Sequence, residues 1–182
     1  VAQDAATNSN LVSNTLSVTY DNTSPTVVIS TTASNPTNTA PIPVTITFSE
    51  AVTGFVVGDI TVANGTAGNF TAVSSTVYTA SITPTANGVV SVSAAAGVAQ
   101  DAATNNNLVS NTLSVTFDNS SPSVVVSTTA TSPTRTSPIP VTFTFSEAVT
   151  GFVVGDIIVV NGTAGNFSAV SSTVYTASIT PT

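Results

Sequence analysis

Eight carboxylates are the side chains of this sequence with the greatest capacity for chemistry. The 182 residues include eight Asp and Glu, a single basic residue (Arg135) and no His, Cys, Met or Trp, which gives a formal net charge of −7. Without imidazole or thiol groups, the chain lacks the usual general base, the thiolate nucleophile, and the donors that hold zinc, copper or haem. Carboxylate and carbonyl oxygens remain, and a hard cation such as Ca²⁺ prefers these ligands.

The same composition argues against catalysis and against basic-surface functions. A carboxylate pair such as Glu50 and Asp59 would suit glycoside hydrolysis, but no Trp is present to stack on a sugar. We therefore expect no enzyme. Nucleic acids and anionic membranes are bound through Lys and Arg, so neither is an expected partner. No apolar run reaches the ~18 residues of a membrane helix, so no membrane contact is expected.

The acids lie within an internal repeat of 97 residues, and the fold of this repeat determines where they are placed. Residues 1–85 align with residues 98–182, and 13 of the 85 aligned pairs differ, among them Tyr20/Phe117 and Asn38/Arg135. Solenoid repeats are shorter, whereas a β-sandwich domain needs about this many residues. The sequence therefore predicts tandem domains.

Two turn motifs set the predicted domain boundaries. DNTSP begins at residue 21 and DNSSP begins at residue 118, each between two strand-like runs. Asx followed closely by Pro interrupts a strand, so both motifs are interpreted as linkers. We expect residues 1–20 to be the C-terminal strand of a preceding repeat, 21–117 to be one complete domain, and 118–182 to be a domain that stops before its last strands.

Period-2 alternation of apolar and polar residues predicts an all-β fold. Val44, Ile46 and Phe48 alternate with Thr45 and Thr47, and no segment has a helical period. Asn64-Gly65 and Asn87-Gly88 are typical of tight turns. The complete repeat accommodates seven strands, at residues 26–31, 44–49, 60–63, 70–73, 77–83, 89–93 and 108–117.

Strand direction predicts that the acids of one domain meet at one end of the sandwich. If successive strands run up and down, the linker before the first strand, the end of the second strand and the loop before the last strand share one end. Four carboxylates there would repel one another, and bound Ca²⁺ at the domain junction would neutralise them. The alternative is that they are separate, solvated loop residues. The predicted ligands are Asp21, Glu50, Asp59 and Asp101 with Asn22 and Asn105, and the incomplete set Asp118, Glu147 and Asp156.

Three motifs carry a resemblance to a known family. FSEAVTGFVVGDITVANG (48–65), NGVVSVSAAAGVAQDAATNNN (87–107) and the linker DNTSPTVVIS (21–30) resemble the bacterial Ig-like repeats of large cell-surface adhesins. The resemblance covers the whole chain. It implies tandem Ig-like sandwiches, an extracellular location on the bacterial surface, and calcium-stiffened junctions. In many such repeats Gly follows Ala-Ala in the last loop, where this chain has Thr104.

Two function classes follow. The first is a structural spacer in the stalk of a surface adhesin, whose partners are the neighbouring repeats of the same chain. The second is a segment of a self-assembling extracellular filament, in which other copies of the chain are the partners. In the second class, residues 1–20 would supply a strand to an incomplete domain such as 118–182 by strand addition. Size in dilute solution discriminates the two classes.

Overall fold

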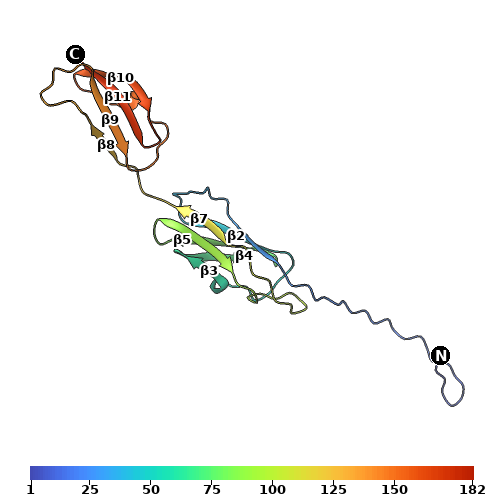
Figure 1. Ribbon diagram of the computed structural model, residues 1–182. Coiled ribbons are helices and arrows are strands. Elements are labelled where there is room, and N and C mark those ends of the chain that lie inside the picture. Colours follow the sequence, from blue (N-terminus) through green and yellow to red (C-terminus); the bar gives the residue numbers. More distant parts are fainter. The chain divides into compact units, whose positions relative to one another are not determined.

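The computed structural model describes residues 1–182, which form two compact units, unit 1 (residues 1–119) and unit 2 (residues 120–182) (Figure 1). Every strand pairing within the sheets is antiparallel, and the only helical elements are two three-residue 3₁₀ turns, η1 (Val57–Asp59) and η2 (Val154–Asp156). The predicted all-β fold is confirmed. None of its helices has the length and apolarity needed to cross a bilayer.

Unit 1 is a sandwich of two sheets. The first sheet has the order β1-β2-β5-β4 and the second has the order β3-β6-β7, which is the four-plus-three division expected of an Ig-like sandwich. The strands are β1 (Val27–Ser30), β2 (Ile42–Phe48), β3 (Ile60–Ala63), β4 (Gly65–Ala72), β5 (Val77–Pro84), β6 (Gly88–Ala94) and β7 (Leu113–Phe117).

Alternation along the strands builds the core of unit 1. In β2, Ile42, Val44, Ile46 and Phe48 are buried, whereas the residues between them are not. Residues from both sheets join them in one apolar cluster, because each sheet presents its apolar face to the other. Four rings close one part of this core through edge-to-face and stacked contacts, namely Phe48, Phe55, Phe70 and Tyr78.

Two predicted strands differ clearly in their bounds from the observed ones, each for a local reason. The strand expected at 70–73 belongs to the longer β4, which begins at Gly65, where a Cβ would lie 2.9 Å from the carbonyl oxygen of Thr83. The strand expected at 108–117 begins only at Leu113. Before it, the Asn111 side chain takes the place of backbone pairing: its Oδ1 accepts from the Ile29 N–H (2.8 Å) and its Nδ2 donates to the Ile29 carbonyl (3.0 Å).

Unit 2 repeats the first sheet of unit 1. Its strands are β8 (Val124–Ser127), β9 (Ile139–Phe145), β10 (Gly162–Ala169) and β11 (Val174–Pro181), in the order β10-β11-β9-β8. The alignment of the repeats makes these the counterparts of β1, β2, β4 and β5. A smaller cluster of buried side chains, Phe143, Tyr175 and Ala177, forms its core.

The segment before Asp21 carries the sequence of β7 without being a strand. Residues 11–20 align with 108–117, yet none of them is assigned to a strand, and all are exposed. Figure 1 shows them as an extended blue segment. We call residues 11–20 the arm.

Candidate functional site

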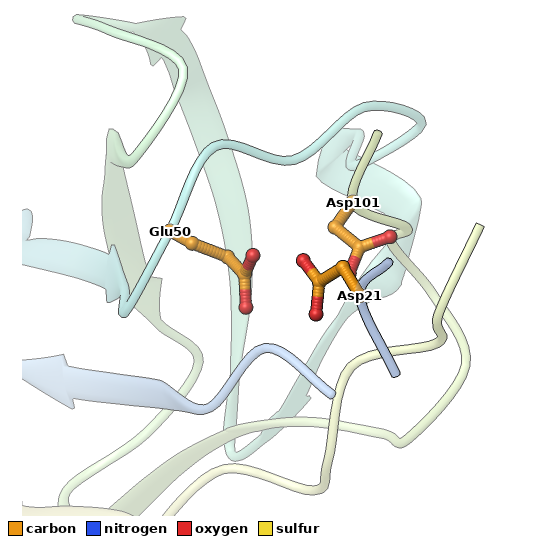
Figure 2. Close-up of side chains that lie close together, drawn as sticks. All are labelled: Asp21, Glu50 and Asp101. Atoms are coloured by element: carbon orange, nitrogen blue, oxygen red, sulfur yellow. The ribbon is translucent and has the colours of Figure 1, made fainter. Parts of the chain in front are cut away.

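Three carboxylates meet at the end of unit 1 where the linker enters β1. Asp21, Glu50 and Asp101 each place a carboxylate oxygen within 4.8 Å of the others. In Figure 2 the carboxylate of Glu50 faces those of Asp21 and Asp101, and the three come from three separate segments. We call these residues the acidic cluster. Antiparallel strand order brings them together, since all three segments lie at the same end of the sandwich.

Each member of the acidic cluster is positioned by its own local structure. Asp21 lies in the turn before β1, where its Oδ1 accepts a hydrogen bond from the Thr23 N–H (2.9 Å). Glu50 follows the end of β2 by two residues. Asp101 lies in the loop between β6 and β7 and is only 5% exposed. The cluster therefore combines an exposed, a half-buried and a buried carboxylate.

The Asp101 loop is closed by the Asp101 carboxylate itself. Its Oδ1 accepts from the N–H groups of Ala103 (2.9 Å) and Asn105 (2.8 Å), and its Oδ2 accepts from the Asn105 side chain (2.8 Å). The same Asn105 amide also donates to the Asp21 carbonyl (3.2 Å). Asn105 therefore links the β6–β7 loop to the linker segment.

The pKa values of Glu50 and Asp101 are shifted in opposite directions. Partial burial, followed by repulsion from Asp21 and Asp101, raises the pKa of Glu50 above its ordinary value of 4.5. The pKa of Asp101 is lowered from 3.8, chiefly by the hydrogen bond from the Asn105 side chain. No basic side chain exists in unit 1 to neutralise the carboxylates, so a bound cation would relieve the repulsion at Glu50.

The geometry of the acidic cluster fits a hard cation. Ca²⁺ binds oxygen at about 2.3–2.6 Å, so two ligands on opposite sides of the ion lie about 5 Å apart. The 4.8 Å limit on the three oxygens falls within that span. Asp21, Glu50 and Asp101 would hold the ion through carboxylate oxygens, with backbone carbonyls and water supplying the remaining ligands.

The fourth predicted acid, Asp59, is not a member of the acidic cluster. Its Oδ2 accepts a hydrogen bond from the Val56 N–H (2.8 Å) and so closes the η1 turn. The expected up-and-down order of the strands puts Asp59 at the same end of the sandwich as the acidic cluster, but it does not reveal this local hydrogen bond of the Asp59 carboxylate. Asn22 is exposed beside Asp21, and Asn105 serves as a hydrogen-bond donor to the cluster.

The acids of the predicted incomplete set, Asp118, Glu147 and Asp156, are each described within their own unit. Asp118 lies at the opposite end of unit 1, where its Oδ1 accepts from the Asn87 side chain (2.9 Å). Glu147 is half-buried after β9, and Asp156 closes η2 by accepting from the Val153 N–H (2.9 Å). The acidic cluster contains Asp101, which lies in the β6–β7 loop, and residues 120–182 contain no counterpart of that loop.

Sequence reasoning missed two asparagines that hold the site in place. Asn107 is 1% exposed, and its side chain accepts from the N–H groups of Val98 and Ala99 and donates to the carbonyls of Ala95 and Leu108. Asn111 joins the segment before β7 to β1. The run NNN at 105–107 was the available signal, but nothing in a run of amides tells which one is buried.

Comparison with known proteins gives one result. The model of a family described as bacterial Ig-like domain matches residues 21–117 and matches again at 118–182. Searches of curated proteins and of solved structures give no significant match.

Proposed function

The chain belongs to the bacterial Ig-like domain family, and from this premise we propose that it is a non-catalytic spacer in the stalk of an extracellular adhesin on the bacterial surface. Such a spacer needs a stable sandwich and a controlled connection between repeats, but no substrate pocket. The family supports a structural repeat. The composition supports the absence of catalysis, because neither imidazole nor thiol is present.

We infer that calcium stiffens the segment by which each repeat is entered. The observation that carries this inference is the acidic cluster, because Asp21 belongs to the linker whereas Glu50 and Asp101 belong to the loops of unit 1. An ion bound to all three would fix the linker to the folded domain. The hydrogen bond from Asn105 to the Asp21 carbonyl already holds the linker in the required position.

Calcium titration of the 182-residue chain by isothermal calorimetry tests this proposal. We expect one site on unit 1, together with a rise in melting temperature on adding Ca²⁺ that a chelator reverses. Glu50→Gln removes one ligand charge and should weaken binding at least tenfold. Asp59→Asn is the matched control, since it makes the same charge change in the same unit at a carboxylate outside the acidic cluster.

Two results would overturn the calcium proposal. One is the absence of any binding heat at millimolar Ca²⁺. The other is an equal loss of affinity in the Glu50 and Asp59 variants, which would indicate general screening of an acidic surface rather than a site.

A further inference from the structure

In unit 1, the segment that follows the linker into β1 is bonded directly to the segment that ends in β7. The Leu108 N–H donates to the Pro25 carbonyl (2.8 Å). The Asn111 side chain then bonds both backbone groups of Ile29, at 2.8 Å and 3.0 Å. Because β1 belongs to the first sheet and β7 to the second, these hydrogen bonds connect the two sheets.

The same connection continues beyond β1. The Asn35 side chain accepts from the Thr116 N–H (2.9 Å) and donates to the Ser114 carbonyl (3.3 Å). The Thr37 N–H donates to the Thr116 carbonyl (2.9 Å), and the Thr37 carbonyl accepts from the Asp118 N–H (2.9 Å). Thr37 is only 6% exposed, so water has little access to these two backbone bonds.

The hydrogen bonds between residues 25–37 and residues 108–118, which we call the seam, join two segments that run in the same direction. Thr37 and Phe117 form a parallel bridge. The sequence separation of the bonded residues also stays nearly constant, at 82 in the first half of the seam and 81 in the second. In antiparallel segments this separation would fall steadily along the chain.

The parallel direction decides how the seam is loaded when the chain is stretched. Figure 1 shows the chain entering unit 1 at one end of the sandwich and leaving it after β7 at the other end. Tension therefore pulls residues 25–37 toward the entry and residues 108–118 toward the exit, along the length of the seam. Two parallel segments can respond to this pull only by sliding past each other, so all the bonds of the seam are loaded together.

Strand pairing and apolar packing fix each segment of the seam in its own sheet. β1 is paired with β2, and β7 is paired with β6. The side chains of Val27 and Ile29 lie in one core with those of Val115 and Phe117, and none of the four is more than 6% exposed. The two segments therefore slide apart only when the seam breaks.

We propose that the seam is a mechanical clamp, which makes unit 1 resist unfolding when tension is applied along the chain. The side chains of Asn35 and Asn111 carry part of the tension, because they supply hydrogen bonds where the two backbones do not pair directly. The clamp lies entirely within unit 1. The inference goes beyond the proposed spacer role, and it requires neither bound calcium nor an adhesive partner.

Single-molecule stretching of the 182-residue chain in two directions, in chelator, tests the clamp. The chain has no Cys, so two introduced thiols define the points of attachment. Thr23→Cys with Asn119→Cys pulls along the seam, whereas Thr39→Cys with Asn119→Cys pulls its two C-terminal ends apart; all three positions are exposed. We expect the second attachment to unfold unit 1 at no more than about half the force of the first, because it opens the bonds one after another.

Removing one amide from the seam tests the contribution of the side chains. Asn111→Ala should raise the unfolding rate at constant force about tenfold when the pull is along the seam, because both bonds to Ile29 are lost. With the second attachment the same substitution should change the rate much less, since the bonds at Thr37 open first. Asn106→Ala is the matched control and should leave both rates unchanged, because the Asn106 side chain bonds Gln100 (2.9 Å), outside the seam.

Any of three results would contradict the clamp. Equal unfolding forces in the two directions show that overall stability, rather than the seam, resists tension. An equal acceleration by Asn111→Ala in both directions shows that this amide stabilises the fold without carrying tension. Equal effects of Asn111→Ala and Asn106→Ala show that the position of the lost amide is immaterial.

Discussion

The loop that carries Asp101 forms the same hydrogen bonds in two very different settings. In the N-terminal copy, Asp4 Oδ1 accepts from the N–H groups of Ala6 and Asn8, and Asp4 Oδ2 accepts from the Asn8 side chain, as Asp101 does with Ala103 and Asn105. Asp4 is exposed whereas Asp101 is buried. At the scale of single residues, the DAATN segment therefore specifies its own conformation.

Thr104 adopts a left-handed backbone conformation within this loop. Its φ is +70°, which a β-branched residue tolerates poorly, and the resembling repeats often have Gly at this position. Thr104→Gly removes a strain of about 1–2 kcal/mol and adds about 0.5–1 kcal/mol of backbone entropy cost. We expect unit 1 to gain about 0.5–1 kcal/mol in denaturant unfolding. Thr7→Gly, with φ +69° outside the sandwich, is the control and should leave unit 1 unchanged.

Glu50 makes the stability of the metal-free protein depend on pH. Its folded-state pKa lies above the ordinary 4.5, so the stability that it contributes is fully present below pH 4.5 and is lost as the pH rises through the folded pKa. Glu50→Gln should therefore raise the melting temperature in chelator at pH 7 and leave it nearly unchanged at pH 3. Scanning calorimetry at both pH values measures this. A lower melting temperature of the variant at pH 7 would contradict the repulsion.

At the scale of elements, asparagine side chains complete the pairing that the strands leave open. Asn107 bonds four backbone groups around the β6–β7 loop, and Asn111 bonds two groups of β1. Strand alternation predicted the elements of this fold well, because burial on one face imposes a period of two. The start of β7 was not predictable, because the Asn111 side chain makes the hydrogen bonds that a strand backbone would make, and such a substitution leaves no periodic pattern in the sequence.

Asn107→Ala tests the contribution of this buried amide. The substitution leaves two N–H and two carbonyl groups without their partner in a site that is 1% exposed. We expect a loss of about 2–4 kcal/mol in chemical denaturation of unit 1. Asn10→Ala is the control, since Asn10 is the aligned residue of the exposed N-terminal copy. If both substitutions lower the free energy of unfolding equally, the amide stabilises the loop conformation itself and burial in unit 1 adds nothing.

In the molecule as a whole, unit 2 contains the counterparts of residues 23–85 of unit 1 and buries fewer apolar side chains than unit 1 does. The core cluster of unit 1 contains 18 buried apolar residues, whereas that of unit 2 contains three. Strands β5 and β11 have the same sequence, VYTASITP, yet Ile82 is fully buried and Ile179 is half-exposed. Their intrinsic chemistry is identical, so any difference between them comes from the surrounding structure.

Hydrogen exchange measures this difference with a built-in control. We expect the amides of β11 to exchange at least tenfold faster than those of β5, because less apolar burial opposes the opening of unit 2. Peptides that include residue 71 or 168 are distinguishable by mass, since Thr71 aligns with Ser168. Equal exchange rates would show that the two units are equally stable.

Structure that forms within a few neighbouring residues follows from the local sequence. The two DAATN loops, the η1 and η2 turns closed by Asp59 and Asp156, and the left-handed Asn64 and Asn161 recur in both copies, because short-range hydrogen bonds and backbone sterics depend only on neighbouring residues. The all-β class was also predictable, since the alternation of apolar and polar residues indicates strands that bury one face.

Which segments meet in a site or in a core depends on the tertiary structure. It brought Asp101 to Asp21 and Glu50, although the three carboxylates come from separate segments of the chain. It packed Val115 of β7 into one core with Val27 and Ile29 of β1. The physical reason is that a carboxylate cluster and an apolar core arise from segments far apart in the chain, and their packing cannot be deduced from either segment alone.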